Sequence, residues 1–436
     1  MTGVTQNPLS HGLWAQTAVP APPTQSLEWD CKVDVAIIGA GYTGLSAALY
    51  LASTGREVAV LETAEPGFGG SGRNVGLVNA GLWMKPDDVV ATLGETHGQR
   101  ILTMLGNGPR LVRDLVQHYD LDCEATFTGT LHCAPDKSGL QDLQDREKQW
   151  RAQGAPVRLL SAEETRRQVG SSRYIGALLD ERAGTIQPLS YARGLASTAQ
   201  LAGAAIYAPA RVTAATRKNG FWQIQTAQAT VSAKWLLVAT NAYTVAPWKA
   251  IREELIRLPY FNIATRPLSD SEMAGILPDR QGCWDTREVL TSFRTDKNNR
   301  MIIGSVGALG QSCERHVHEA WARRSLARIY PQLKNVPFES AWFGMIGMTT
   351  NSVPRLHRLG DQAIAISGYN GRGISPGTAF GRCLAQYICG EIADSDMPLP
   401  FTAMEAPRFR TGRELFYSVG SVLAHEVDAR FSGKFL

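Results

Sequence analysis

A glycine-rich turn between an apolar strand and a helix constrains the fold of this chain more than any other feature. Residues 33–38 form a short apolar run typical of buried parallel strands, and Gly39-Ala40-Gly41-Tyr42-Thr43-Gly44 follows directly. A helix is predicted next, because apolar residues recur at helical spacing: Leu45, Ala48, Leu49 and Ala52. A second strand, residues 58–61, ends at Glu62. The run predicts one complete strand–helix–strand unit within a parallel sheet.

The spacing Gly39-x-Gly41-x-x-Gly44 in this context is typical of a dinucleotide-binding turn. Gly39 permits the tight turn, Gly41 lets the backbone approach a pyrophosphate, and Gly44 lets the helix pack close to the strand. The unpaired N–H groups at the start of the helix attract the phosphates. Glu62 can accept hydrogen bonds from an adenosine ribose. Ordinary turn and packing glycines are the alternative, and they leave the complete unit unexplained.

Two further glycine-rich segments favour FAD over NAD as the dinucleotide. One covers residues 67–76, and the other, residues 368–373, lies between a predicted strand at 363–367 and a helix that runs to about 392. Two helix N-termini in one site suit a long ligand, with phosphates at one and a flavin ring at the other. A helix that starts after Gly373 directs its N–H groups at the negative charge of a reduced flavin. A flexible helix-entry loop at 368–373 and an NAD-dependent dehydrogenase remain the alternatives.

Composition excludes several other classes of protein. The 436 residues suffice for about two to three domains. With 44% hydrophobic and 19% charged residues, the balance is that of an ordinary globular protein. The net charge of +4, from 44 basic and 40 acidic residues, predicts no nucleic-acid partner.

The cysteines and the N-terminal residues bear on the location of the protein. There are 7 cysteines, an odd number, and no two form Cys-x-x-Cys, which favours a reducing compartment. Residues 1–30 show no secretory signal, and no apolar run is long enough to span a membrane. We therefore expect a cytoplasmic protein without a transmembrane segment.

The rest of the chain alternates between helical and strand-rich segments. Residues 1–30 read as an extended arm, because the run 19–23 is rich in proline. Residues 85–170 look mostly helical, and 204–240 look strand-rich. Antiparallel strands are predicted at 258–266 and 284–306, with Asn298-Asn299 as a hairpin turn, and a helix at 314–335.

At four ordered blocks the chain resembles the D-amino-acid-oxidase-like family of FAD oxidoreductases. The blocks are residues 34–45, 69–74 (Gly-Gly-Ser-Gly-Arg-Asn), 238–243 (Val-Ala-Thr-Asn-Ala-Tyr) and 368–374 (Gly-Tyr-Asn-Gly-Arg-Gly-Ile). The likeness covers about residues 30–395. It implies an α/β fold, α+β overall, with a Rossmann-type FAD-binding domain and a discontinuous antiparallel-sheet substrate domain. We expect an arm at 1–30, the FAD-binding domain at 31–85, 150–250 and 335–395, the substrate domain at 86–149 and 251–334, and an extension at 396–436.

Within the family the chain looks most like the bacterial branch that holds L-pipecolate oxidase and γ-glutamylputrescine oxidase. Val75 replaces a glycine of the Ser-Gly-Arg-Asn-Gly-Gly pattern usual for the putrescine enzyme, which favours the pipecolate type. Some relatives bind FAD covalently through a cysteine near residues 342–348, and this chain has none there, so we expect non-covalent FAD. The resemblance implies these cofactor-binding residues: Gly39, Gly41, Tyr42, Thr43, Gly44, Glu62, Thr63, Gly70, Ser71, Gly72, Arg73, Asn74, Val75, Gly76, Leu77, Val212, Thr240, Asn241, Gly347, Gly371, Arg372, Gly373 and Ile374.

The family's reaction transfers a hydride from a carbon that bears nitrogen to flavin N5 and gives an imine. Positioning dominates such a step, and no dedicated catalytic base is identified. A carboxylate on the substrate needs an arginine, for which Arg294, Arg266 and Arg355 are the candidates. Structural ion pairs are the alternative for each. Four aromatic residues could form the wall of an apolar slot, although core packing would explain each equally well: Tyr260, Phe261, Trp284 and Tyr369.

The first hypothesis is an FAD-dependent enzyme of amine catabolism that oxidises a secondary amine or amino acid, with L-pipecolate first. The alternatives are oxidation of γ-glutamylputrescine or another polyamine conjugate, and a non-catalytic FAD-binding redox sensor. Oxygen or a quinone or other electron carrier would reoxidise the flavin. The motif Cys313-x-x-His316-x-His318 lacks a distant fourth ligand, so no metal is predicted.

Overall fold

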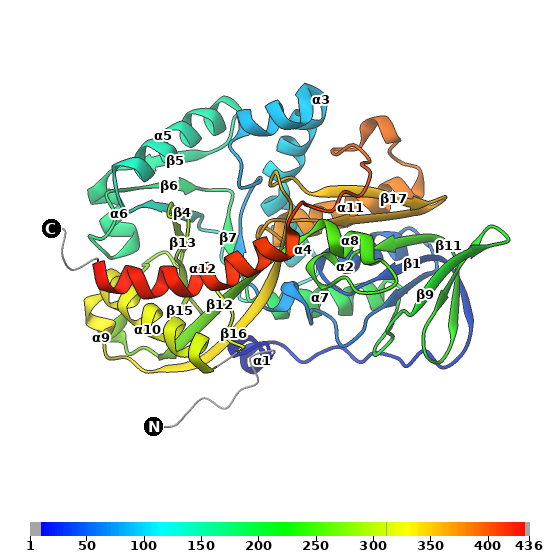
Figure 1. Cartoon of the computed structure of the whole chain (residues 1–436), viewed down its shortest axis with the longest axis horizontal. Coiled ribbons are helices and arrows are strands. Elements are labelled where there is room, and N and C mark those ends of the chain that lie inside the picture. Colours follow the sequence, from blue (N-terminus) through cyan, green and yellow to red (C-terminus); the bar gives the residue numbers. More distant parts are fainter. Residues whose placement is uncertain (1–9, 311, 432–436) are drawn as a thin grey trace.

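The computed structural model describes residues 10–310 and 312–431, with the side chains of 418, 419 and 427–431 left out. Two large sheets divide the molecule, and in Figure 1 the first lies to the right and the second to the left. The described helices are α1 (Leu13–Thr17), α2 (Tyr42–Ser53), α3 (Pro86–Gly106), α4 (Gly108–His118), α5 (Lys137–Ala152), α6 (Ala162–Val169), α7 (Pro188–Leu201), α8 (Lys249–Glu254), α9 (Asp270–Met273), α10 (Ser312–Ile329), α11 (Ile374–Cys389) and α12 (Arg410–Phe431).

The first sheet has the strand order β17-β18-β11-β1-β2-β8, with β9 and β10 attached beside β11. Its strands are β1 (Cys31–Ile38), β2 (Val58–Leu61), β8 (Ala205–Tyr207), β9 (Ala214–Lys218), β10 (Phe221–Gln225), β11 (Thr230–Val238), β17 (Arg355–Gly360) and β18 (Ala363–Ser367). The strands β18, β11, β1, β2 and β8 run parallel. Because β2 and β18 are buried throughout, they read as continuous apolar runs. The predicted parallel α/β unit is confirmed.

Helices α2 and α11 follow β1 and β18 and pack against each other on this sheet. Glycine makes the contact close: a Cβ on Gly381 would lie 2.5 Å from the carbonyl oxygen of Thr43. A Cβ on Gly44 would lie 2.0 Å from the carbonyl oxygen of Gly39, so α2 also sits tightly on its own strand. Ser46 Oγ donates to Thr378 O across the pair at 2.8 Å. The two helices therefore begin at the same edge of the sheet.

The second sheet has the order β16-β12-β15-β14-β13-β4-β6-β5. Its strands are β4 (Thr130–Ala134), β5 (Val157–Leu160), β6 (Gly176–Asp180), β12 (Ile256–Pro267), β13 (Gly282–Asp285), β14 (Ser292–Thr295), β15 (Arg300–Val306) and β16 (Phe338–Met348), while β3 (Leu77–Val78) and β7 (Gly184–Thr185) form a separate pair. All its pairings are antiparallel except β13 with β4. The predicted hairpin turn is present, since Asn299 has φ 60° and its N–H bonds to Asp296 O.

The structure adds detail to three sequence expectations. Residues 85–170 are mostly helical, as expected, although β4 and β5 also lie within them. The strands β5, β6 and β16 pair in the second sheet, so the predicted domain boundaries at 150 and 335 divide that sheet. Residues 1–30 are not only an extended arm, because α1 is a buried helix. These strands of four to eleven residues, and the five-residue helix α1, are stabilised by partners far away in the chain rather than by local sequence.

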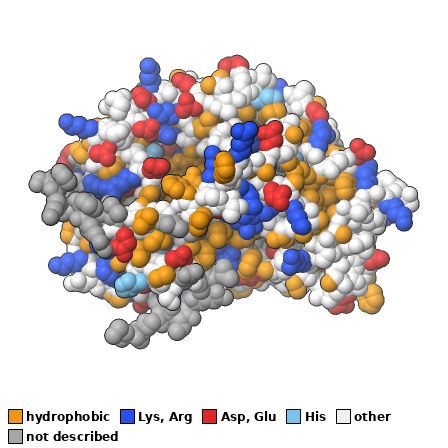
Figure 2. Space-filling view, in the orientation of Figure 1, with side chains coloured by type: hydrophobic (Ala, Val, Ile, Leu, Met, Phe, Trp, Pro, Cys, Tyr) orange, Lys and Arg blue, Asp and Glu red, His pale blue; other side chains and the backbone are white. Residues whose placement is uncertain are grey.

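Charged side chains of both signs are interspersed over the face shown in Figure 2, as the small net charge suggests. Among the described residues, no helix combines the length and the apolar character needed to cross a bilayer.

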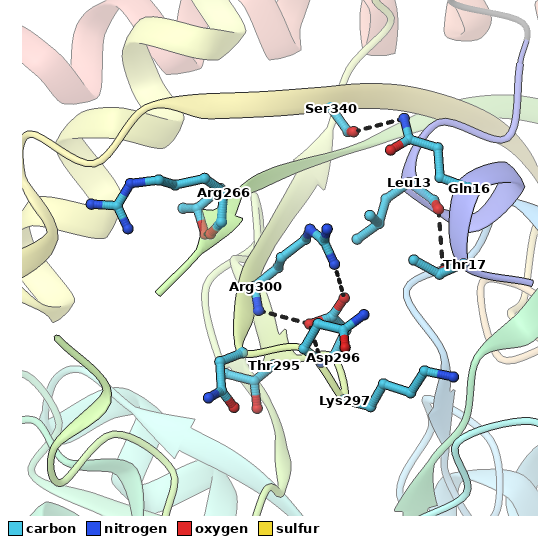
Figure 3. Close-up of polar contacts among 12 residues, drawn as sticks. Leu13, Gln16, Thr17, Arg266, Thr295, Asp296, Lys297, Arg300 and Ser340 are labelled. Atoms are coloured by element: carbon cyan, nitrogen blue, oxygen red, sulfur yellow. Dashed lines mark hydrogen bonds and ion pairs between the residues drawn. The ribbon is translucent and has the colours of Figure 1, made fainter. Parts of the chain in front are cut away.

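Helix α1 docks beneath the loop that carries residues 70–76. Trp14 is fully buried, its ring lies 5.4 Å from that of Trp342, and its Nε1 donates to Asn74 O at 2.9 Å. Gln16 reaches Ser340 Oγ on β16, as Figure 3 shows. The N-terminal segment is thus part of the packed structure and supports a predicted cofactor loop.

Replacing Trp14 by alanine should lower the free energy of unfolding by about 3–5 kcal/mol, because a large buried side chain is lost. Trp29, which is 79% exposed, is the matched control, and Trp29→Ala should change the free energy by less than about 0.5 kcal/mol. Urea denaturation of both variants measures the difference. Equal effects of the two substitutions would show that α1 is not docked.

Helix α10 contacts α12 through a pair of buried histidines. His318 Nδ1 lies 2.8 Å from His425 Nδ1, and the His318 ring stacks on Phe261. Burial lowers the pKa of His318 from 6.5 to about 4, so the folded protein holds this imidazole neutral.

Acidification from about pH 6.5 to about 4 should therefore lower the free energy of unfolding. In this range His318 is protonated in the unfolded chain and stays neutral in the folded protein. His318→Gln should lessen this loss, as seen in urea midpoints at neutral and acidic pH. His316 is exposed on the same helix, and His316→Gln should leave the pH dependence unchanged. An unaltered pH dependence in His318→Gln would contradict this assignment.

Candidate active site

A channel of about 320 Å³ lies where α2 and α11 begin, at the carboxyl ends of β1 and β2. It lies where an open parallel sheet binds ligands. Fourteen of the predicted cofactor residues line it: Gly39, Gly41, Tyr42, Thr43, Glu62, Thr63, Gly70, Ser71, Asn74, Thr240, Asn241, Gly347, Gly371 and Gly373. Residues that the sequence analysis selected from six separate segments thus line one continuous space.

Glu62 is fixed in the wall of this channel. Its Oε2 accepts from the Ala40 N–H at 2.9 Å, and its Oε1 accepts from the Ala64 N–H at 3.0 Å. Burial raises the pKa of this carboxyl, while the backbone N–H groups oppose the change. A carboxylate held in this way can accept hydrogen bonds from the two hydroxyl groups of a ribose.

The start of α2 offers backbone N–H groups beside the turn at Gly41. The N-cap residue of this helix, Gly41, has no side chain to cap it, and Gly39 has φ 101°, which favours glycine. A Cβ on Gly41 would lie 2.9 Å from Ser71 Oγ, so the loop at 70–74 passes close over the turn. The Tyr42 N–H donates to Ser71 Oγ at 3.1 Å. This cradle fits a pyrophosphate.

Asn74 holds the loop at 70–76 in shape. Its Nδ2 donates to Tyr42 Oη at 3.1 Å, to Gly70 O at 3.0 Å and to Ser71 O at 2.9 Å. Its Oδ1 accepts from the Gly76 N–H at 2.8 Å. One amide therefore satisfies several groups of a loop that regular secondary structure does not hold.

The other end of the channel is formed by the start of α11 and the loop before it. Asn241 Oδ1 accepts from the Gly368 N–H at 2.8 Å, and the Asn370 N–H donates to Gly347 O at 3.1 Å. No side chain caps α11 either. Its N–H groups and dipole make this end positive, as the ring of a reduced flavin requires.

A second cavity of about 380 Å³ adjoins the channel. The two spaces share six lining residues: Gly70, Asn74, Met345, Ile346, Gly371 and Gly373. Aromatic side chains of Trp83, Tyr260 and Trp284 line the second cavity. A small molecule in this cavity would therefore lie beside the flavin end of a bound FAD.

Arg372 is a partly buried cation of the second cavity, and Arg73 on the same lining is buried more completely. Its Nη1 donates to Ala80 O at 2.6 Å, and its guanidinium lies 4.8 Å from the Trp83 ring and 5.8 Å from the Trp284 ring. Its Nε is buried without an acceptor among the described residues, and so is Trp284 Nε1. Burial lowers the pKa of Arg372 to about 9. Two donors in one cavity thus lack an acceptor.

Acidic and neutral groups line the same cavity. Asp285 is buried, and its Oδ1 accepts from the Thr291 N–H at 3.0 Å. Burial raises the pKa of Asp285. The His132 ring stacks on Trp284 at 4.9 Å, and burial lowers its pKa well below the ordinary value, so the imidazole is neutral.

Two predicted substrate-binding residues line the second cavity, namely Tyr260 and Trp284, and the others do not. The Arg294 guanidinium is buried away from it and donates to Ile186 O, Gly76 O and Thr295 O, so it is a structural residue. Arg266 pairs with Glu272 at 2.8 Å, is partly exposed, and points away from the other side chains labelled in Figure 3.

Three further aromatic or basic candidates are also corrected. Arg355 lies 3.8 Å from Glu254, and Phe261 packs in the core against His318. Tyr369 lines the cofactor channel instead, where its Oη lies 2.7 Å from Thr43 Oγ1.

Nine predicted cofactor residues lie outside the channel lining. Five line the second cavity: Arg73, Val75, Leu77, Arg372 and Ile374. Four line neither space: Gly44, Gly72, Gly76 and Val212. The three glycines are close-packing positions, since a Cβ on any of them would approach a carbonyl oxygen within 2.4 Å. Val212 is buried in the segment between β8 and β9, and its neighbour Arg211 lines the channel.

Several lining residues escaped the sequence analysis. The channel adds Phe68, Gly69, Arg211, Ala239, Tyr243, Val245, Met345 and Ile346, and the second cavity adds, among others, Trp83, His132, Asp142, Arg146, Asp285, Arg287 and Glu288. Tyr243 belongs to a block that the sequence analysis quoted. The charged residues carry no local signal, because strands and loops far apart in the chain bring them together.

Neither space is lined by a cysteine among the described residues, which accords with non-covalent FAD. Within the described ranges, no three histidine, cysteine, aspartate or glutamate side chains are grouped to hold a metal.

Replacing Glu62 by glutamine should weaken the binding of FAD about 10- to 100-fold, because a hydrogen bond to a charged acceptor contributes about 1.5–3 kcal/mol. Glu57 is exposed in the same strand–helix–strand unit, and Glu57→Gln should bind FAD normally. Titration of the apoprotein with FAD, followed by flavin fluorescence, measures both. Normal affinity in Glu62→Gln would remove the ribose contact from this site.

Comparisons with known proteins agree with this geometry. The chain is 32% identical over 417 residues to the γ-glutamylputrescine oxidoreductase of Escherichia coli, covering 94% of this chain and 96% of that protein. The glycine oxidase structure from Geobacillus kaustophilus superposes with a TM-score of 0.68 at 19% identity, covering 86% of this chain and 99% of that one. The L-proline dehydrogenase structure from P. horikoshii gives a TM-score of 0.67 at 18% identity, covering 90% and 99%.

The family model described as FAD dependent oxidoreductase matches residues 34–387. That range contains most of β1, all of α2, both cavities and most of α11. The match confirms the D-amino-acid-oxidase-like resemblance and the fold class that it implied, and it gives FAD as the cofactor. The chain therefore belongs to the FAD-dependent oxidoreductase family.

Proposed function

We propose that this FAD-dependent oxidoreductase oxidises the C–N bond of an amine that also carries a carboxylate. The observation that carries the proposal is the pair of unsatisfied donors, Arg372 Nε and Trp284 Nε1, in the cavity beside the flavin end of the channel. A buried guanidinium Nε–H and a buried indole N–H without acceptors are costly, and a bound carboxylate would satisfy both.

Bound FAD supplies the hydride acceptor of the reaction. The protein residues hold the substrate against it. Arg372 and Trp284 bind the carboxylate, and the rings of Trp83 and Tyr260 exclude water from the reacting carbon. The His132 imidazole, held neutral by burial, adds no positive charge beside the substrate amine, which must itself be neutral for hydride loss.

Among carboxylate-bearing amines we place a γ-glutamyl conjugate of a polyamine first. Such a molecule is long and carries a cationic amine as well as a carboxylate. The cavity has both kinds of partner, since Asp285 and Glu288 line it together with Arg372. The similarity to the γ-glutamylputrescine oxidoreductase supports the same choice.

L-Pipecolate, a cyclic imino acid, is the second candidate. The two tryptophan rings that flank Arg372 favour it, because a saturated ring can pack between aromatic walls while its carboxylate meets the guanidinium.

All seven cysteines are free thiols, which supports a reducing compartment such as the cytoplasm as the place of the reaction.

Anaerobic reduction of the bound flavin tests these candidates directly. The substrates are γ-glutamylputrescine, putrescine, L-pipecolate, piperidine, L-proline, sarcosine and D-alanine. We expect bleaching with a carboxylate-bearing amine and much slower bleaching with its partner that lacks the carboxylate. Bleaching by none of them would favour the redox-sensor alternative, and equal rates within each pair would contradict a carboxylate site.

Replacing Arg372 by methionine should lower kcat/KM for the carboxylate-bearing substrate about 100-fold, because a charged hydrogen-bond partner is lost. The analogue without the carboxylate should change less than about threefold. Steady-state rates with each matched pair of substrates provide the measurement.

Arg294→Met is the control for this experiment. Because it removes the donor to the Ile186 carbonyl and one of the two donors to the Gly76 carbonyl, it should lower the free energy of unfolding by about 1–3 kcal/mol. The folded fraction should keep its preference for the carboxylate. A selective loss of carboxylate-bearing substrates in Arg294→Met, but not in Arg372→Met, would reverse the assignment.

A further inference from the structure

Helix α12, mainly in its first half, and the residue before it expose large apolar side chains to solvent. Phe409 is 87% exposed, Phe416 72%, Leu415 63% and Leu423 58%. Elsewhere the most exposed apolar side chains, Leu201 at 89% and Trp29 at 79%, lie on separate elements. A cluster of this kind on one helix calls for a binding partner, whereas single exposed residues do not.

The inner face of α12 is fixed to the protein. Ser421 and His425 are buried, and Glu414 Oε1 accepts from Arg252 Nη2 and from the Arg257 N–H, each at 2.9 Å. Phe416 and Leu423, two turns apart, therefore point away from the protein. Figure 1 places α12 across the front of the molecule, and Figure 2 shows hydrophobic side chains along the same strip.

The exposed apolar face is broad. Leu415, Phe416 and Tyr417 are consecutive and all exposed, so they cover about 200° of the helix circumference. Phe409 adds a fourth large side chain in the turn before α12, where it has φ 56° and its carbonyl accepts from the Arg413 N–H. A seam for a second helix would be a narrow stripe, whereas a helix that lies in a bilayer interface needs a broad apolar face.

Basic side chains accompany this face. Arg408 and Arg413 are exposed on either side of Phe409 in the chain, and the nearest acid of the helix, Glu414, is already bound to Arg252 and Arg410. Arginines beside inserted phenylalanines complement anionic lipid headgroups, while their aliphatic stems cover apolar surface. The charge therefore matches a negatively charged surface.

We propose that the first half of α12 docks the enzyme on the surface of an anionic phospholipid bilayer, with Phe409 and Phe416 inserted among the lipids and Arg408 and Arg413 at the headgroups. The attachment also connects to the active site. Glu414 holds Arg257, and the Arg257 guanidinium donates to Ala242 O at 2.7 Å and to Thr244 O at 3.2 Å, beside the channel residues Asn241 and Tyr243.

Flotation of the FAD-loaded enzyme with vesicles tests the proposal. Vesicles of phosphatidylcholine alone are compared with vesicles that also contain phosphatidylglycerol. We expect binding to the anionic vesicles, weakened by salt. The double variant Phe409→Ser/Phe416→Ser should bind at least about tenfold less, and Arg408→Gln/Arg413→Gln should lose about tenfold on anionic vesicles only.

Leu201→Ser and Trp29→Ser are matched controls, since they remove equally exposed apolar side chains elsewhere, and they should bind as the unaltered enzyme does. Every variant should keep its flavin absorbance. Failure of the unaltered enzyme to float, or equal binding by the phenylalanine variant, would overturn the proposal. Light scattering that shows a dimer dissociated by Phe416→Ser would assign the face to a second copy of the chain instead. None of these outcomes depends on which amine is oxidised.

Discussion

The close contact of α2 with α11 is the feature on which the rest of the structure depends. Gly44 lets α2 rest on the turn at Gly39, and Gly381 lets α11 approach the backbone of α2. The starts of the two helices are thereby brought to one sheet edge, although 332 residues separate Tyr42 from Ile374 in the chain. A larger side chain at either glycine would separate the two positive helix ends that a long, doubly anionic cofactor needs to meet together.

The second cavity depends on this arrangement, because its floor is the end of the cofactor channel. The loop before α11 contributes Gly371 and Gly373 to both spaces and Arg372 to the second one. One short segment thus lines the cofactor channel with backbone that carries no side chains and presents a guanidinium to the second cavity. The second sheet supplies Tyr260 and Trp284 from β12 and β13 and closes the cavity over the flavin position.

The sequence predicted the cofactor site far better than the substrate site. The turn at Gly39, the acid at Glu62 and the loop at 368–373 are local patterns with fixed spacing, and backbone geometry makes them informative. The direction in which a long side chain points is not determined by its neighbours in the sequence. Arg294 lies on β14 of the second sheet, which also lines the second cavity, yet its guanidinium bonds to Gly76 and Ile186. Arg372, in the glycine-rich loop, lines the second cavity instead. The strands β4 and β5 were missed for a related reason, since they are short and depend on partners in other segments.

The docking of α1 has a consequence for how the N-terminus and the cofactor affect each other. The Trp14 indole bonds to the carbonyl of Asn74, whose side chain shapes the loop over the phosphate cradle. Any ligand that stabilises this loop must then stabilise the docked N-terminal helix by the same free energy, and undocking must loosen the ligand equally. Proteolytic sensitivity near residue 18 would in that case report flavin occupancy, and a bulky fusion at the N-terminus would yield a paler protein.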